Sequence, residues 1–238
     1  MTIVSFCGIL YTDRRFVSVR SKKMPRNKYP EETVKLILDT AARLFTEKGF
    51  EKTSLQDIMN ETKLSKGAIY HHFTSKDDIF IKICADTSKR TEQLLSKVRD
   101  DKRLNGREKL KKIYAEALGN AVNNEIVPMQ PYMISNHKFL AAQVESLMRE
   151  VAPDYIQPIL EQGIADKTLH GIEHPRQTAE MLSLLSSLWL NPLLLPSSDE
   201  EIIARGEVVM SVLNRIGADF TAEELIRPYL SYNRMLQK

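Results

Sequence analysis

The feature that most constrains the fold of this chain is a helical repeat of apolar residues, which begins near Glu31 and continues almost to the C-terminus. In its first segment Val34, Leu38, Ala41 and Phe45 recur at steps of three or four, the spacing of one helix face. Further helical segments are expected at 107–123, 135–150, 154–168, 176–190, 199–216 and 222–236. Because no segment convincingly alternates apolar and polar residues as a strand does, the pattern predicts an all-α protein.

Capping residues mark the helix boundaries near the N-terminus. Gly49 is expected to close the first helix, since glycine tolerates the left-handed turn found there. Thr53 and Gln56 have the spacing of a capping box, in which the two side chains satisfy free backbone amides. Ser65 and Ser75 are further candidate N-caps. The helices predicted from these caps are 53–61, 65–73 and 75–98.

The segments 53–61 and 65–73 have the dimensions of a helix-turn-helix unit. In that unit the first helix crosses the DNA backbone and the second enters the major groove. The second helix carries four residues away from its core positions: Lys66, Gly67, Tyr70 and His71. Glycine in a helix costs about 1 kcal/mol relative to alanine, so the expected use of Gly67 is to let the backbone approach DNA closely.

Three motifs follow one another at fixed spacing: Thr53-Ser54-x-x-Asp57-Ile58, Leu64-Ser65-Lys66-Gly67-Ala68-Ile69-Tyr70-His71-His72-Phe73 and Ser75-Lys76-x-x-Ile79. They are preceded by a helix that ends in Leu44-Phe45-Thr46-Glu47-Lys48-Gly49-Phe50. Over about residues 31–80 the chain therefore resembles the TetR family of bacterial transcriptional regulators. The resemblance is weak beyond Ile79. It implies an N-terminal three-helix DNA-binding domain with a helix-turn-helix, and a larger C-terminal helical domain for ligand binding and dimerisation.

The resemblance also assigns roles by position in the N-terminal domain. It implies phosphate contacts by Thr53, Ser65, Tyr70, His72 and Lys76. The helix N-termini at Ser54 and Ser75 would add amide donors. It implies that Lys66, Ala68 and His71 face base edges, where Lys66 suits guanine acceptors and Ala68 a thymine methyl. Taken singly, each residue is equally typical of an exposed polar or a packed small side chain.

The turn departs from the family pattern at Lys63. The family usually has Ala-Gly-Val there, whereas this chain has Thr62-Lys63-Leu64. Glycine adopts a left-handed backbone without steric cost, so either Lys63 adopts it under strain or the turn changes shape. Leu64 still suits its core position, which leaves the angle between the two helices as the less certain expectation.

The region from about 80 to 238 is too large to serve only as a DNA clamp, and the resemblance implies a ligand pocket and a dimer interface there. Pockets are mostly apolar with few polar groups, and the candidate lining residues are Tyr132, Met133, His137, Phe139, Tyr155 and Trp189. At helical spacing, such residues are more often core. The candidate dimer contacts are Leu182, Leu185, Trp189, Val208, Val209, Val212 and Leu213, although an internal core helix would show the same pattern.

Charge is distributed unevenly along the chain. Residues 1–75 carry 13 basic and 8 acidic side chains, whereas residues 76–238 carry 21 and 23. Most of the basic excess lies in the first 24 residues, which are expected to form a flexible tail or, alternatively, an arm that follows phosphates or enters a minor groove. The expected domains are a basic tail (1–24), a helix-turn-helix DNA-binding domain (25–75) and a ligand-binding and dimerisation domain (76–238).

Two features bear on the compartment in which the chain works. Its two cysteines, Cys7 and Cys84, offer at most one disulfide and no paired metal spacing, which favours a reducing cytoplasm. The longest apolar stretch, Met181–Leu195, is interrupted by polar residues and is shorter than the roughly 20 apolar residues that a bilayer requires. We therefore expect a cytoplasmic protein without a membrane segment.

Enzymatic and metal sites have little support in the sequence. His71 and His72 are adjacent, so in a helix their side chains point about 100° apart and no metal site is expected. His170 to His174 matches the zinc-protease pattern H-x-x-E-H, but Gly171 and Pro175 favour a loop. Since no other catalytic or cofactor-binding fingerprint occurs, we expect no enzyme, cofactor or metal.

Together with these patterns, the resemblance implies a homodimeric regulator of transcription, most simply a repressor that a small-molecule effector releases from its operator. Its two recognition helices are expected about 34 Å apart, on a pseudo-palindromic double-stranded DNA operator. The long helix 75–98 is the expected lever between the two domains. The alternatives are a helical ligand-binding or protein-interaction module without DNA binding, for which Lys63 is the best argument, and a helical enzyme.

Overall fold

The computed structural model describes residues 30–119, 137–192 and 194–236, and every regular element within these ranges is a helix. The elements are α1 (Pro30–Lys48), α2 (Leu55–Thr62), α3 (Lys66–His72), α4 (Lys76–Arg99), α5 (Gly106–Gly119), α7 (His137–Ser146), η2 (Leu147–Ile156), α8 (Gln157–Ala165), α9 (Pro175–Leu184), η3 (Leu185–Trp189), α10 (Asp199–Arg215) and α11 (Ala222–Leu236). η2 and η3 are π-helical. The all-α prediction is confirmed, and the predicted tail, 1–24, lies outside the described residues.

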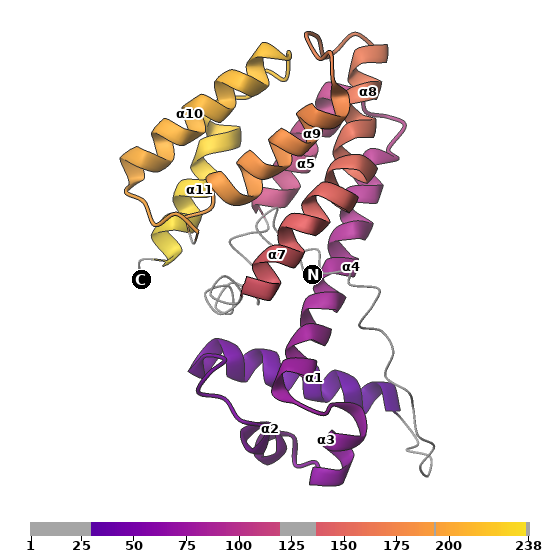
Figure 1. Ribbon diagram of the computed structural model, residues 1–238, viewed down its shortest axis with the longest axis vertical. Helices are drawn as coiled ribbons and strands as arrows, with labels where there is room; N and C mark the ends of the chain where they lie inside the picture. Colours follow the sequence, from indigo (N-terminus) through magenta and orange to yellow (C-terminus); the bar gives the residue numbers. More distant parts are fainter. Residues whose placement is uncertain (1–29, 120–136, 193, 237–238) are drawn as a thin grey trace.

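The N-terminal body consists of α1, α2, α3 and the first turns of α4 (Figure 1). Ile58 of α2 and Ile69 of α3 are fully buried in its core. Phe50, in the loop after α1, lies between Phe45 and Phe80, with ring centroids 4.9 and 5.1 Å away. Because each helix contributes to this one core, the orientation of α3 is fixed by packing on the other three.

Helix α4 extends from the N-terminal body to the C-terminal body (Figure 1). Ile79 and Cys84 belong to the N-terminal core, whereas Leu95 and Val98 belong to the C-terminal core. The N-terminal core therefore reaches Cys84, beyond the expected division at residue 75, since α4 buries its first turns against α1. A helix packed into both cores is a direct mechanical connection between them.

The C-terminal body contains α5 to α11, and its helices pack at close range. A methyl group placed on Gly106 of α5 would lie 2.2 Å from the Cα of Gly163 in α8, so this crossing requires glycine. A buried polar contact lies further inside, where the hydroxyls of Ser186 and Tyr114 are 2.8 Å apart. The Tyr229 hydroxyl donates to the Ser186 carbonyl at 2.8 Å. Burial raises the pKa of Tyr114 to about 12, so its hydroxyl stays protonated.

One expected break in the chain is wrong. The segments 135–150 and 154–168 were expected to be separate helices, but α7, η2 and α8 follow one another without a loop. Pro153 lies inside η2 and Pro158 in the first turn of α8. Proline has no amide to donate, and a π-helical turn is a known way to accommodate a local disruption of helical hydrogen bonding. The two prolines thus coincide with a change of helix type and not with the end of the helical segment.

The apolar faces of α9 and α10 also differ from expectation. Leu182, Val209 and Leu213 were assigned to contacts with a second copy, but each is buried in the core of its own chain. The apolar side chains that remain exposed nearby include Met181 on α9 and Val208 on α10. The alternative reading of these segments as internal core helices therefore holds for the three buried residues.

Candidate nucleic-acid interface

Helix α2 is capped by Ser54, not by Thr53 as the sequence suggested. The Ser54 hydroxyl accepts from the Asp57 amide at 3.1 Å, and the Ser54 amide donates to the Asp57 carboxylate at 2.8 Å. The Ser54 hydroxyl, which also donates to the Asp57 carboxylate at 2.5 Å, and the Ser54 amide hold the pKa of Asp57 below its ordinary value. The capping box is therefore real but shifted by one residue, with Asp57 in the place expected for Gln56.

Thr53 has an internal role. Its side chain is buried, and its hydroxyl lies 2.9 Å from the Gly49 carbonyl and 3.2 Å from that of Leu44. Gly49 ends α1 with φ +84°, as expected of a glycine there. The Thr53 hydroxyl thus ties the start of α2 to the end of α1, and we leave it out of the proposed phosphate contacts.

The turn between α2 and α3 keeps the helix-turn-helix geometry at the cost of strain. Lys63 lies in the left-handed region, with φ 58° and ψ 18°. A non-glycine residue in this conformation costs roughly 1 kcal/mol. The Thr62 hydroxyl donates to the Ile58 carbonyl at 2.7 Å, which ties the turn to α2. Of the two outcomes left open by the sequence, the structure shows the strained lysine and not a remodelled turn.

Helix α3 begins after Ser65, whose hydroxyl accepts from the Ala68 amide at 3.2 Å. Ile69 faces the core, while the adjacent Tyr70, about 100° further round the helix, has 44% of its surface accessible. The residues of α3 predicted to face DNA are exposed or partly exposed: Lys66, Gly67, Ala68, Tyr70, His71 and His72. A methyl group added to Gly67 would meet nothing closer than the Ser65 hydroxyl, at 4.0 Å. Packing within the chain therefore does not require glycine at this position.

The two adjacent histidines differ in environment. Burial, and to a lesser extent the neighbouring His71, lower the pKa of His72. Their rings meet edge to face, with centroids 4.7 Å apart. At neutral pH His72 is therefore mainly uncharged, so the phosphate contact predicted for it would be a hydrogen bond and not an ion pair.

Lys76 is the first residue of α4, and its ammonium already contacts Phe50 of the same chain. Its ammonium donates to the Phe50 carbonyl at 2.7 Å and lies 4.1 Å from the centroid of the Phe50 ring. Ser75 caps α4 as predicted, accepting from the Asp78 amide at 3.0 Å. Lys76 has three donor hydrogens, so a phosphate contact remains open to it, but this lysine also holds α4 against the loop after α1.

The first turns of the three helices differ in charge. Those of α2 and α4 contain carboxylates, from Asp57 in one and from Asp77 and Asp78 in the other, whereas α3 has none. Carboxylates near a helix N-terminus stabilise the helix but repel a second anion. The amide donors expected at Ser54 and Ser75 are therefore less available to phosphate than the sequence suggested.

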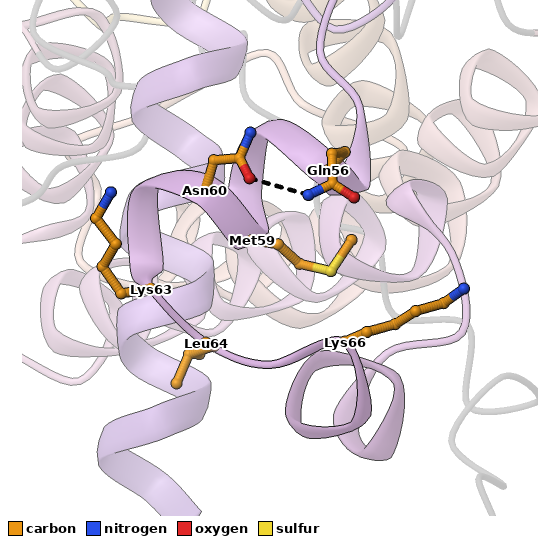
Figure 2. A pocket seen from close by; sticks show the side chains of 6 residues that line it. All are labelled: Gln56, Met59, Asn60, Lys63, Leu64 and Lys66. Atoms are coloured by element: carbon orange, nitrogen blue, oxygen red, sulfur yellow. Dashed lines mark hydrogen bonds between the residues drawn. The ribbon is translucent and has the colours of Figure 1, made fainter.

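An open hollow of about 430 Å³ lies between α2 and the start of α3, and we call it the α2–α3 hollow (Figure 2). It is lined by Gln56, Met59, Asn60, Lys63, Leu64 and Lys66. The Gln56 side-chain amide donates to the Asn60 carbonyl oxygen at 2.9 Å along one edge. Neither Gln56 nor Asn60 was predicted as a binding residue, although their spacing of four residues places them on one face of α2.

The candidate effector residues are only partly described. Tyr132 and Met133 lie outside the described residues, and His137 and Phe139 belong to α7 without a description of their side chains. Tyr155 and Trp189 are partly buried and pack against the C-terminal core. The Arg99 guanidinium lies 5.3 Å from the centroid of the Tyr155 ring. Their assignment to a ligand pocket stays a prediction.

Neither a metal centre nor a membrane helix is found in the described part of the chain. No three His, Cys, Asp or Glu side chains there gather in a way that could hold a metal ion. The residues from His170 to His174 lie in the loop between α8 and α9, which agrees with their interpretation as a loop. No helix within the described ranges is long and apolar enough to cross a bilayer.

Comparison with known proteins places this geometry in a family. Residues 37–83 match the model of the bacterial regulatory proteins of the tetR family. The chain is 47% identical over 51 residues to the HTH-type transcriptional regulator YuxN of Bacillus subtilis (strain 168), which is 21% of this chain and 18% of YuxN. It is 42% identical over 53 residues to IcaR of Staphylococcus aureus (strain Newman), the negative regulator of the biofilm operon icaADBC, or 21% of this chain and 28% of IcaR. The matched segments thus span less than a third of either relative.

The likeness extends further in the fold. SmeT, the repressor of the Stenotrophomonas maltophilia multidrug efflux pump SmeDEF, superposes with a TM-score of 0.59 over 77% of this chain and 91% of SmeT, at 18% identity. At that identity the likeness concerns the fold alone. Residues 37–83 are therefore similar to the tetR family of bacterial regulatory proteins, and the fold of the chain is similar to that of SmeT.

Proposed function

We propose that this protein is a sequence-specific DNA-binding transcriptional regulator, and specifically a repressor that a small-molecule effector releases from its operator. It would act in the bacterial cytoplasm, where the operator lies. The observation that carries the proposal is the surface of α3, where polar and small side chains are exposed on a helix whose other side is fixed in the core by Ile69. The proposed base contacts are Lys66, Ala68 and His71, with Gly67 allowing close approach.

The proposed phosphate contacts surround this helix. They are made by Ser65, Tyr70, His72 and Lys76, which lie on α3 or next to its ends. Tyr70 is the most exposed of the large side chains in this group, and the Lys66 ammonium lies 5.7 Å from the centroid of its ring. Phosphate contacts fix the position of a protein on the duplex, whereas base contacts give it specificity.

We infer that the regulator acts as a homodimer on an inverted repeat, with recognition helices about 34 Å apart. The exposed apolar side chains of α10, among them Ile203 and Val208, support a contact between copies in this region.

The effector would bind the C-terminal body. SmeT has been solved as a complex with triclosan, which supports a small-molecule effector by analogy of fold. In the described part of this chain the buried Ser187 hydroxyl has no hydrogen-bond partner, and such a group usually bonds to water or a ligand. Since α4 is packed into both cores, an effector that prefers one C-terminal conformation would shift the separation of the two α3 helices.

The proposal is tested by incubating the full chain with a pool of randomised duplexes and sequencing what it retains. We expect an inverted repeat to be enriched, and we expect the affinity to fall as salt rises. Lys66→Ala should weaken binding by about 1–3 kcal/mol and relax the preference at one position of each half-site. The control is Lys167→Ala, an exposed lysine after α8. Retention of no duplex at low salt would support the alternative, a helical module without DNA binding.

A further inference from the structure

The α2–α3 hollow contains two lysines that differ from other cations of the N-terminal body. Lys63 and Lys66 form no ion pair within the described ranges, and both line the hollow. By contrast, Arg43 pairs with Glu61 at 2.8 Å, and Lys48 lies 3.5 Å from Asp57. Those two cations are compensated by carboxylates, whereas the two lysines of the hollow add uncompensated positive charge to the helix-turn-helix surface.

Hydrogen-bond donors reinforce this charge. Asn60 accepts from Gln56 through its carbonyl oxygen, which orients its amide group and leaves its two donor hydrogens without a partner in the described structure. Figure 2 shows the Asn60 amide nitrogen and the Lys63 ammonium on the same side of α2. No acidic side chain lines the hollow. An ammonium and an amide donor that line one hollow, with no carboxylate among the lining residues, are suited to an anionic oxygen.

The position of Lys63 is itself informative. Its left-handed backbone would be unstrained with glycine, and asparagine tolerates it better than lysine does. A lysine held there keeps a cation at a fixed point of the turn, three residues before Lys66. Strain of this kind is found at functional sites more often than elsewhere.

We propose that the α2–α3 hollow is an additional phosphate-binding site, in which Lys63 and Asn60 bind one backbone phosphate of the DNA that α3 reads. This inference rests on the proposed function, because it requires a duplex on α3. Lys66 forms the other side of the hollow and is directed to the bases. The hollow thus separates two roles: Lys63 adds affinity that does not depend on sequence, while Lys66 selects the sequence.

The test compares Lys63→Gly with the wild-type full chain on the same duplex over a series of salt concentrations. Glycine removes the charge and suits the backbone, so the variant keeps the turn. The slope of log affinity against log salt should decrease by about one for each bound protomer, and the affinity at about 0.15 M salt should fall about fivefold per contact. The preference among base sequences should not change.

Lys167→Gly is the matched control. Lys167 also has a positive φ, 63°, and is exposed, but it follows α8 at the end of the molecule away from α2 and α3 (Figure 1). The Lys167→Gly variant loses the same charge and the same backbone strain as Lys63→Gly, and its salt slope should equal that of the wild type. Lys63→Arg keeps the charge and should keep the slope.

A wild-type slope and affinity in Lys63→Gly, or an equal loss in Lys167→Gly, would overturn the phosphate site. If Lys66→Ala still weakened binding in that case, the proposed function would stand without it. If the wild-type chain bound no duplex at all, the proposed function itself would fail. An altered base preference in Lys63→Gly would also overturn the inference, since it would make Lys63 a base contact.

Discussion

The two bodies that α4 connects are stabilised in different ways. In the N-terminal body each of α2, α3 and α4 begins with a serine whose hydroxyl accepts from an amide three residues later. In the C-terminal body α10 has the same kind of cap, at Ser198, and contacts between distant parts of the chain add to it, such as Gly106 with Gly163 and Ser186 with Tyr114. About 50 residues of the N-terminal region match relatives in sequence, whereas the likeness of the rest is one of fold.

DNA binding and regulation are assigned to different bodies of the molecule. In the N-terminal body local caps set where α2 and α3 begin, and packing into one shared core fixes the orientation of α3. The C-terminal body depends on long-range packing, and its shape is coupled to the N-terminal body through α4. Substitutions should therefore act on one body or the other in a predictable way.

The largest effect is expected from Ile69→Ala in the N-terminal body. Ile69 is fully buried, and removing a buried isoleucine side chain costs about 2–5 kcal/mol. Hydrogen exchange should show faster opening of α2 and α3, with little change in α9 to α11, and DNA binding should be lost. Ile164→Ala, at a side chain of α8 that is 37% exposed, is the control. Equal acceleration in both bodies would contradict their separate stabilisation.

Gly106→Ala should produce the corresponding effect in the C-terminal body. The added methyl group would meet the backbone of Gly163 at 2.2 Å, so α5 and α8 must move apart, at a cost of about 1–3 kcal/mol. Chemical denaturation monitors the loss.

Gly67→Ala is the counterpart in α3, where nothing obstructs a methyl group. That variant should gain up to about 1 kcal/mol in stability and bind DNA less well; a loss of stability comparable to that of Gly106→Ala would break the comparison.

Ser54→Ala removes the cap of α2 and should cost about 1 kcal/mol at neutral pH. The pKa of Asp57 is lowered in the folded chain by its hydrogen bonds with Ser54, so this contribution is present above the unfolded pKa, near 4, and is lost as pH falls through the folded value. The difference between wild type and variant should therefore shrink below pH 4. Denaturation at pH 7 and pH 3 measures it, and a pH-independent difference would argue against this capping box.

The smallest effects are expected from the two left-handed lysines. Lys63→Gly and Lys167→Gly should each stabilise their own body by up to about 1 kcal/mol, because the relief of backbone strain exceeds the added entropy of the unfolded chain. Thermal unfolding measures both. A destabilised Lys63→Gly would show that the turn depends on the lysine side chain for its structure.

Local signals predicted much of the N-terminal body. The positions of α2, α3 and α4 follow from Ser65, Ser75 and the apolar spacing, and the structure agrees within one or two residues. The choice between Thr53 and Ser54 as cap does not follow, because it depends on carbonyls of Leu44 and Gly49 that approach only in the folded domain. The hollow was missed for the same reason, since Lys63 and Lys66 meet Gln56 and Asn60 only across the turn.

In the C-terminal body the periodicity predicted helices but not which face each one buries. Leu182 and Val208 both fit an apolar stripe, yet the first is 1% exposed and the second 52%. The π-helical turns around Pro153 have no counterpart in a 3.6-residue pattern. Long-range packing decides both features.

The central claim, that the exposed side of α3 reads DNA, is tested most directly by the affinity of Lys66→Ala for the duplex selected by the wild-type chain. We predict a loss of about 1–3 kcal/mol and a weaker preference at one position of each half-site, with Lys167→Ala unchanged. Wild-type affinity and preference in Lys66→Ala would contradict the claim.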